Sequence, residues 1–300
     1  MESTTLVNGQ PSNTLEVSDR GLAYGDGVFE TIALSQGQVQ LWQGHQQRLI
    51  TGLLTLGIVA DRVSAQNLVD AIANDIQTAY ALYGRPKGVI KITVTRGSGG
   101  RGYAPPIESI PTRIVFILPW PLGRSHLSGD GVRVQICQHR WSNNTALAGV
   151  KHLNRLDQVM ARREWSDSNI HEGIMLDQNG LVISGVMSNL FIQMDGVLIT
   201  PKLDQCGING TMAQVVRTIA EQCNIDVVQQ QVTLELLLKA DAAFMTNSLN
   251  GMWPIITLTQ SALGSPSLNT TRWPISALIQ TLQKTLAQHL SEQLTVGEIC

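Results

Sequence analysis

The stretch GVKHLNRLDQ, residues 149–158, contains one of only six lysines in a chain of 300 residues. Lys151 follows an apolar Ala-Gly-Val and precedes His152, Asn154 and Arg155. A primary amine that is partly withdrawn from water has a lowered pKa and becomes nucleophilic, which is the property that a Schiff-base lysine needs. A lysine that extends its charged end into solvent is the more common case and would show the same local sequence. The stretch alone leaves both interpretations open.

A second stretch, GINGTM at 207–212, places glycines directly before a segment with a helical pattern. The first N–H groups of a helix lack partners and carry the positive end of its dipole, so a phosphate can bind there. Ile208 and Asn209 would then donate main-chain N–H groups, and Thr211 could add its hydroxyl. An ordinary tight turn followed by a helix cap fits the same residues. The chain has no GxGxxG or Walker motif, so neither a dinucleotide nor ATP is expected to supply the phosphate.

Two arginine-containing stretches could bind the anionic parts of a ligand. Arg48, in HQQR at 45–48, could give its guanidinium to the same phosphate, although an arginine on an amphipathic helix is usually solvated. RGSGGRGY at 96–103 places two arginines among four glycines. This pattern is typical of a loop whose backbone approaches a carboxylate closely. A flexible hairpin tip is the alternative.

Composition narrows the class of protein. The chain is 43% hydrophobic and 15% charged, with a net charge of −2, which predicts a sizeable core. This charge gives no reason to expect nucleic acid or an anionic membrane as a partner. No run approaches the roughly 18 apolar residues of a membrane span, and the N-terminus lacks the pattern of a signal peptide. We therefore expect a cytoplasmic protein.

Cysteine and histidine spacings argue against a disulfide framework and against a metal site. The four cysteines are far apart and form no CxxC, and the six histidines form no HxH or HExxH. We expect reduced thiols at all four cysteines, which are Cys137, Cys206, Cys223 and Cys300.

Hydrophobic periodicity predicts a mixture of strands and helices. The predicted strands are 28–34, 39–42, 88–97, 112–120, 132–140, a series of short strands over 172–201, and 242–248. The predicted helices are 45–58, 63–84, 154–167, 207–224 and 275–290. Ser64 is the expected cap of the second helix, and Asn154 with Asp157 has the spacing of an approximate capping box for the third.

The stretch PWPLGRSHLSGDG at 119–131 is rich in Pro, Gly and Ser, which predicts a linker. We therefore expect two α+β domains. A small N-terminal α/β domain would cover 1–118, an interdomain linker 119–130, and a larger C-terminal domain 131–300.

Taken together, six stretches resemble the class IV aminotransferase family. They are SDRGLAYGDGVFETI (18–32), HQQR (45–48), RGSGGRGY (96–103), GVKHLNRL (149–156), SNLF (188–191) and GING (207–210). That family contains branched-chain and D-amino-acid aminotransferases and 4-amino-4-deoxychorismate lyase. The resemblance runs from about residue 5 to about residue 255, and KHLNRL with RGSGGRGY looks specifically like the lyase.

This resemblance implies a D-amino-acid aminotransferase-like α+β fold with a small N-terminal α/β domain and a larger C-terminal pseudo-barrel domain that binds the cofactor. The implied cofactor is pyridoxal 5′-phosphate. The implied assembly is a homodimer, with the site between the two domains and near the subunit interface. The implied substrate is a small carboxylate.

By position, the resemblance implies a role for individual residues. Lys151 matches the lysine that joins the cofactor covalently. Phe29 matches an aromatic residue beside the substrate, and Arg101 with Tyr103 matches a pair that reaches the substrate carboxylate from the neighbouring subunit. The implied cofactor contacts are Lys151, Arg48, Ser184, Asn189, Ile208, Asn209 and Ser248.

Ser184 departs from the family pattern, because the family has a glutamate there that pairs with the pyridine nitrogen of the cofactor. An anion at this place keeps the ring protonated and makes it a strong electron sink. A serine hydroxyl either donates to that nitrogen or accepts from it, and it does not stabilise the cation comparably. We therefore expect transamination to suffer more than an elimination that yields an aromatic product.

The expected activity is a carbon–oxygen elimination that converts 4-amino-4-deoxychorismate to 4-aminobenzoate and pyruvate, a step toward folate. Lys151 would serve as covalent anchor and as general base. One alternative is an aminotransferase of the same fold acting on a D- or branched-chain amino acid. Another is a degenerate cofactor-binding paralogue in which the loss of glutamate at Ser184 marks abandoned chemistry.

Overall fold

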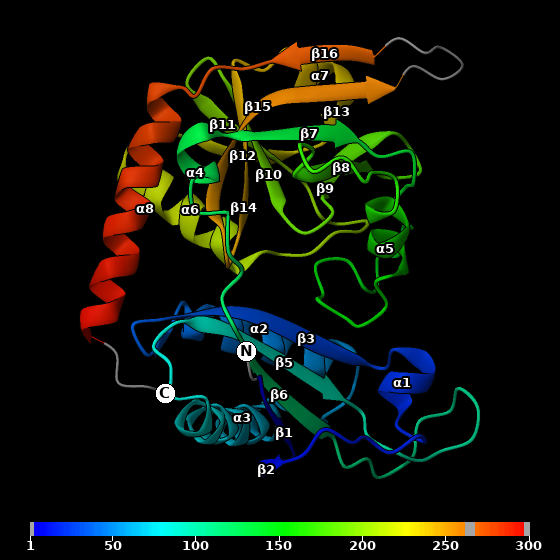
Figure 1. The fold of residues 1–300 in the computed structure, drawn as a ribbon. Coiled ribbons are helices and arrows are strands. Elements are labelled where there is room, and N and C mark those ends of the chain that lie inside the picture. Colours follow the sequence, from blue (N-terminus) through cyan, green and yellow to red (C-terminus); the bar gives the residue numbers. More distant parts are fainter. Residues whose placement is uncertain (1–2, 262–267, 297–300) are drawn as a thin grey trace. The chain divides into compact units, whose positions relative to one another are not determined.

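The computed structural model describes residues 3–261 and 268–296, and these form two compact units (Figure 1). Unit 1 contains the chain as far as Pro121, the short segment Val150–Asn154 and the described residues from Leu290 on. Unit 2 contains Leu122–Gly149 and Arg155–His289. Among the described residues, no helix is both long enough and apolar enough to cross a membrane.

Unit 1 is built on a six-stranded antiparallel sheet in the order β2-β1-β6-β5-β3-β4. Its strands are β1 (Thr4–Val7), β2 (Gln10–Pro11), β3 (Gly27–Ser35), β4 (Gln38–Val39), β5 (Gly88–Thr95) and β6 (Thr112–Leu118). Its helices are α1 (Arg20–Tyr24), α2 (Trp42–Thr55) and α3 (Arg62–Tyr83). Apolar residues of α2 and α3, among them Leu49 and Ile72, pack with Ile32 of β3 and Ile92 of β5 in one buried core.

The strands and helices predicted in this unit are confirmed, but several of their ends are shifted: the helix predicted at 45–58 spans Trp42–Thr55, and the strands predicted at 88–97 and 112–120 end at Thr95 and Leu118. The strand predicted at 39–42 ends at Val39 because Leu41 has a φ of 54°, a left-handed conformation that starts α2 instead. Ser64 is not the cap of α3. The side chain of Asp61 accepts the main-chain N–H of Ser64 at 2.8 Å and caps the helix.

Unit 2 contains a ten-stranded sheet in the order β12-β11-β10-β14-β15-β7-β8-β9-β13, with β16 paired to β15. Its strands are β7 (Val132–Ile136), β8 (Glu172–Leu176), β9 (Leu181–Gly185), β10 (Asn189–Met194), β11 (Val197–Pro201), β12 (Val227–Gln230), β13 (Val232–Thr233), β14 (Ala242–Asn247), β15 (Gly251–Ser261) and β16 (Leu268–Arg272). Its helices are α4 (Leu127–Asp130), α5 (Leu156–Arg162), α6 (Thr211–Gln222), α7 (Leu234–Leu238) and the first part of α8 (Ala277–Val296). The predicted α+β class is confirmed.

The third predicted helix is shorter than expected, and its capping box is wrong. It begins at Leu156, without a side-chain cap, and ends at Arg162. Asn154 instead donates its side-chain N–H to the carbonyl oxygen of Gly25 at 3.2 Å. The carboxylate of Asp157 accepts the main-chain N–H of Ser142 at 3.0 Å. Both polar side chains are therefore used in loop contacts. The expected strand over 132–140 likewise ends at residue 136.

Candidate functional site

Lys151 lies in unit 1, in a segment that runs beside β3. The main-chain N–H of Phe29 donates to the carbonyl oxygen of Lys151 at 3.0 Å, and that of Leu153 donates to Gly27 at 2.9 Å. The Nζ atom of Lys151 lies 4.3 Å from the centre of the Phe29 ring, which is the distance of a cation–π contact. The two predicted residues are therefore in contact, and the amine is a positioned group on a fixed backbone.

A buried charge cluster in the same unit contains Arg48. Its Nε donates to Oε1 of Glu30 at 2.7 Å, and a second guanidinium nitrogen donates to Oε2. The Nδ1 atom of His45 lies 2.7 Å from the same Oε2. Glu30 is 1% exposed and His45 0% exposed. These bonds fix the plane of the Arg48 guanidinium.

Burial by itself would raise the pKa of Glu30, but the Arg48 charge and its hydrogen bonds, helped by His45, outweigh burial and lower the pKa to about 2. Burial lowers the pKa of His45 despite the neighbouring carboxylate. A neutral His45 then donates from Nδ1 to Glu30. Its Nε2 is a buried acceptor with no hydrogen-bond partner within the described part of the chain.

The predicted carboxylate receivers, Arg101 and Tyr103, are exposed on the loop between β5 and β6, Tyr103 to 87%. The buried guanidinium of Arg20 holds this loop by its backbone. It donates to the carbonyl oxygens of Gly102 at 3.2 Å, Tyr103 at 3.0 Å and Ala104 at 3.3 Å. The loop is thus a fixed surface feature of unit 1.

In unit 2, the turn before α6 is joined to the residue that stands two positions before Lys151. Gly149 donates its N–H to the carbonyl oxygen of Gly207 at 3.0 Å, and Asn209 donates its N–H to the carbonyl oxygen of Gly149 at 3.0 Å. The main-chain N–H of Asn209 is therefore bonded within the protein, which corrects the expectation that it donates to a phosphate. Asn189 donates its side-chain N–H to the carbonyl oxygen of Ile208 at 2.9 Å. Three of the predicted cofactor residues thus meet at this turn.

Two buried hydroxyls near the start of α6 have no hydrogen-bond partner in the described ranges. They belong to Thr211, which is 3% exposed, and Thr246, which is 1% exposed. Thr246 lies opposite Asn189 in the β10–β14 pair, and Ser248 follows in the turn after β14. Buried hydroxyls in native proteins nearly always have a partner. This pair therefore fits a polar ligand, such as a phosphate, at the beginning of a helix whose cap, Gly210, supplies no side chain.

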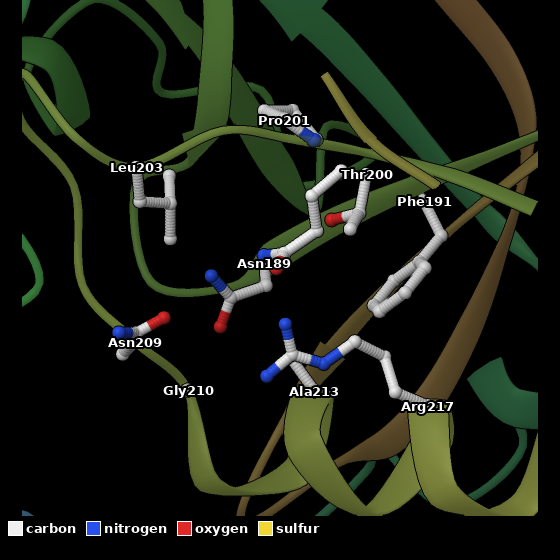
Figure 2. Close-up of a pocket in the computed structure, with 10 residues that line it drawn as sticks. Asn189, Phe191, Thr200, Pro201, Leu203, Asn209, Gly210, Ala213 and Arg217 are labelled. Carbon is white, nitrogen blue, oxygen red and sulfur yellow. The ribbon is translucent and has the colours of Figure 1, made fainter. Parts of the chain in front are cut away.

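A small pocket lies beside the same turn, between α6 and strands β10, β11 and β12 (Figure 2). Asn189, Asn209 and Gly210 line it, and the guanidinium of Arg217 points toward Asn189 (Figure 2). Burial lowers the pKa of Arg217 from its ordinary value, but an arginine remains charged. This places a positive charge on α6 near the turn.

Ser184, on β9, is 4% exposed and has two hydrogen bonds. The indole Nε1–H of Trp141 donates to Ser184 Oγ at 3.2 Å, and that hydroxyl donates to the carbonyl oxygen of Gly185 at 2.8 Å. Trp141 belongs to the apolar cluster that also contains Ile183 and has Ile208 packed against it. The same packing therefore supports Ser184 and the turn before α6.

Glu172, on the neighbouring strand β8, is a fully buried carboxyl that the sequence did not single out. It accepts the hydroxyl of Ser188 at 2.9 Å and the main-chain N–H groups of Gly173 at 3.0 Å and Met187 at 3.3 Å. Burial outweighs these bonds and raises the pKa of Glu172 to about 7.

The predicted site residues are divided between the two units. Unit 1 contains Phe29, Arg48, Arg101, Tyr103 and Lys151, and unit 2 contains Ser184, Asn189, Ile208, Asn209 and Ser248. Sequence reasoning missed the partners of these residues, which are Arg20, Glu30, His45, Trp141 and Thr246. The HQQR spacing, which places His45 and Arg48 on one face of a helix, is the signal that could have shown a shared acid between them.

The predicted reduced thiols are confirmed for Cys137, Cys206 and Cys223, which are free. Cys300 lies outside the described residues.

A family described as amino-transferase class IV matches residues 27–258 of this chain. An aminodeoxychorismate lyase from Vibrio harveyi is 32% identical over 287 residues, which cover 93% of this chain and 98% of the relative. A putative branched-chain-amino-acid aminotransferase from Methanocaldococcus jannaschii is 31% identical over 247 residues, covering 80% and 81%. The crystal structure of 4-amino-4-deoxychorismate lyase from Pseudomonas aeruginosa has a TM-score of 0.85 and 39% sequence identity, with coverage of 95% and 99%.

Proposed function

Since the chain belongs to the class IV aminotransferase family, we propose that it is a pyridoxal-phosphate-dependent lyase that converts 4-amino-4-deoxychorismate to 4-aminobenzoate and pyruvate. The observation that carries this proposal is similarity over nearly the whole chain to two lyases of that name, one of them a solved structure at 39% identity. Pyridoxal 5′-phosphate is the cofactor of this family. When bound, it withdraws electrons from the carbon that carries the substrate amine.

Lys151 is the residue that would hold the cofactor covalently. Once the substrate amine had replaced it there, the freed Nζ would take the proton from the amine-bearing carbon. The contact of Nζ with the Phe29 ring stabilises the amine after it has taken the proton, because the ring face attracts a cation. The backbone bonds at Phe29 and Leu153 keep this lysine in place during the transfer.

The phosphate of the cofactor would lie at the start of α6. The buried hydroxyls of Thr211 and Thr246 would donate to it there. We assign Ile208 and Ser248 to the same phosphate. Asn189 and Asn209 would act by shaping the turn, through their bonds to Ile208 and Gly149. Arg48, oriented by Glu30, would add charge to the phosphate site.

Ser184 would face the ring nitrogen, and Arg101 with Tyr103 would bind a carboxylate of the substrate. We propose a homodimer in which this loop reaches the neighbouring subunit's site, since both side chains are exposed on unit 1. The free thiols of Cys137 and Cys206 fit a reducing compartment, and we propose the cytoplasm as the place of action.

The test is a product assay on the purified protein with pyridoxal 5′-phosphate and 4-amino-4-deoxychorismate. We expect 4-aminobenzoate and pyruvate in equal amounts; formation no faster than without protein would end the proposal. A second arm replaces the substrate with D-alanine or leucine and follows conversion of the bound cofactor to pyridoxamine phosphate. Fast conversion there, with no 4-aminobenzoate in the first arm, would favour an aminotransferase.

A further inference from the structure

We propose that the Ser184 hydroxyl meets the cofactor's ring nitrogen as a hydrogen-bond acceptor, and that Trp141 and Gly185 impose this direction. The inference rests on the proposed function, in which Ser184 faces that nitrogen. It adds Trp141 as a positioning residue and decides which protonation state of the ring the protein favours.

The direction of each bond at Ser184 Oγ follows from the chemistry of its partners. An indole N–H only donates, so Oγ accepts the bond from Trp141 at 3.2 Å. A main-chain carbonyl only accepts, so the hydroxyl hydrogen points to the carbonyl oxygen of Gly185 at 2.8 Å. A hydroxyl has one donor and two acceptor positions. Only an acceptor position therefore remains for a third partner.

Burial keeps this arrangement in place. Ser184 is 4% exposed and Trp141 is 6% exposed, so turning the hydroxyl away would break its bond to the buried carbonyl of Gly185 where no bulk water can replace it. The indole itself is fixed, because the main-chain N–H of Trp141 donates to the carbonyl oxygen of Leu176 at 2.9 Å. The Arg155 guanidinium lies 5.4 Å from the centre of the indole ring.

The charged groups around this pair come from three elements. Arg155 lies over Trp141 at the start of α5. Glu172 of β8 is next to Gly185. A Cβ atom added to Gly185 would stand 3.1 Å from the carboxyl carbon of Glu172. Asp177 is bridged by its backbone to Trp141, and its carboxylate is used by the N–H groups of Asn179 and Leu181.

A hydrogen-bond acceptor beside the ring nitrogen stabilises its protonated form, whereas a hydrogen-bond donor stabilises its unprotonated form. Removing an acceptor therefore lowers the pKa of the ring nitrogen, and removing a donor raises it. A carboxylate in the same place would raise this pKa further, because it adds charge to the hydrogen bond. The predicted order of the pKa is S184E above wild type, and wild type above S184A.

The test is the pH dependence of the ring-nitrogen chemical shift in holoenzyme loaded with pyridoxal phosphate that is ¹⁵N-labelled in the ring. We expect S184A to lower the nitrogen pKa by about one unit, the scale of one hydrogen bond to a charged group. We expect S184E to raise it. The control S168A changes an exposed serine of the same unit and should keep the wild-type value.

A ring-nitrogen pKa in S184A that is equal to or above the wild-type value would overturn the inference while leaving the lyase proposal standing. A protein that binds no cofactor, with no absorbance removable by borohydride, would instead remove the proposed function and this inference together. Product formation is measured separately, so a slow variant that still binds cofactor gives a valid pKa. The rise of the ring-nitrogen pKa expected in S184E is an independent measurement, which tests the inference if S184A folds poorly.

Discussion

Gly149 accepts the main-chain N–H of Asn209 at 3.0 Å and stands only two residues before Lys151. Consecutive Cα atoms are about 3.8 Å apart, so chain connectivity alone keeps the Cα atoms of Gly149 and Lys151 within about 7.6 Å. Gly149 has a φ of 81°, and an added Cβ would stand 3.2 Å from the side-chain nitrogen of Asn209. The positive φ favours a glycine there, and an added Cβ would also require the Asn209 side chain to move.

Replacement of Lys151 by alanine should remove the covalent bond to the cofactor and the general base together. We expect lyase activity to fall by at least about 10³-fold, with loss of the absorbance that borohydride removes. Absorbance spectra and 4-aminobenzoate formation measure this. The matched control is Lys239→Ala, since that lysine is exposed and paired with Glu235 on α7. Retained covalent cofactor in Lys151→Ala would contradict the assignment.

Gly210→Ala should weaken cofactor binding, because the added Cβ would overlap Oδ1 of Asn189 and displace the turn before α6. We expect the cofactor dissociation constant to rise at least about tenfold and stability to fall by about 1–3 kcal/mol. Fluorescence titration and urea denaturation measure the two effects. Gly129→Ala is the control, because an added Cβ there meets open space. Equal effects of both changes would argue against this role of the turn.

Glu30→Gln should destabilise the protein at pH 7 by about 3–5 kcal/mol, because it removes the carboxylate charge that pairs with the Arg48 guanidinium in a buried place. The pKa of Glu30 is about 2 when folded and 4.5 when unfolded, so its contribution is present above pH 4.5 and is lost as the pH falls toward 2. The difference from wild type should therefore shrink in that window.

Urea denaturation at pH 7 and pH 3.5 measures this effect. Glu235→Gln, at an exposed ion pair, is the control and should leave the midpoint unchanged. A constant difference between wild type and Glu30→Gln at both pH values would show that Glu30 contributes through packing and not through charge.

Glu172 should make stability fall as the pH rises from 4.5 to about 7. Its folded pKa of about 7 lies above the unfolded value of 4.5, so the folded state keeps a proton that the unfolded state releases in this window. One pKa unit corresponds to about 1.4 kcal/mol, so the full change is about 3 kcal/mol. Glu172→Gln should remove this slope in urea denaturation, whereas the exposed Glu221→Gln should keep it.

Arg101→Ala should raise the KM for 4-amino-4-deoxychorismate about tenfold to a hundredfold, the range expected for a hydrogen bond to a charged group. A smaller change in kcat is expected, because Arg101 is assigned to binding and not to proton transfer. Steady-state kinetics measure both constants. The exposed Arg85 provides the control variant Arg85→Ala. An unchanged KM would remove Arg101 from the substrate site.

Much of the secondary structure was predictable because hydrophobic periodicity is a local property. The alternation in β3 and the apolar stripes of α2 and α3 are visible in the sequence. Helix ends were less predictable, because Asn154 and Asp157 bind distant loop atoms instead of capping α5. Such competition between local and distant partners is not encoded in spacing.

The candidate site was predictable by position but not by partner. Lys151 and Phe29 were both expected near the substrate, and the structure places them in contact. Glu30 and Trp141 were not expected, since they act through Arg48 and Ser184 from elements far away in the sequence. An ion pair or an indole hydrogen bond across 18 or 43 residues requires the folded chain to be seen.

The five residues Val150–Asn154 belong to unit 1, although unit 2 provides the chain on both sides of them. Neither unit is therefore a continuous stretch of polypeptide. A gene cut between Pro121 and Leu122 would make an N-terminal fragment in which β3 lacks the neighbour that bonds to Phe29 and Gly27. Protein engineers who split this chain into complementing halves, or exchange one half with a relative, would have to carry this insert with the first half.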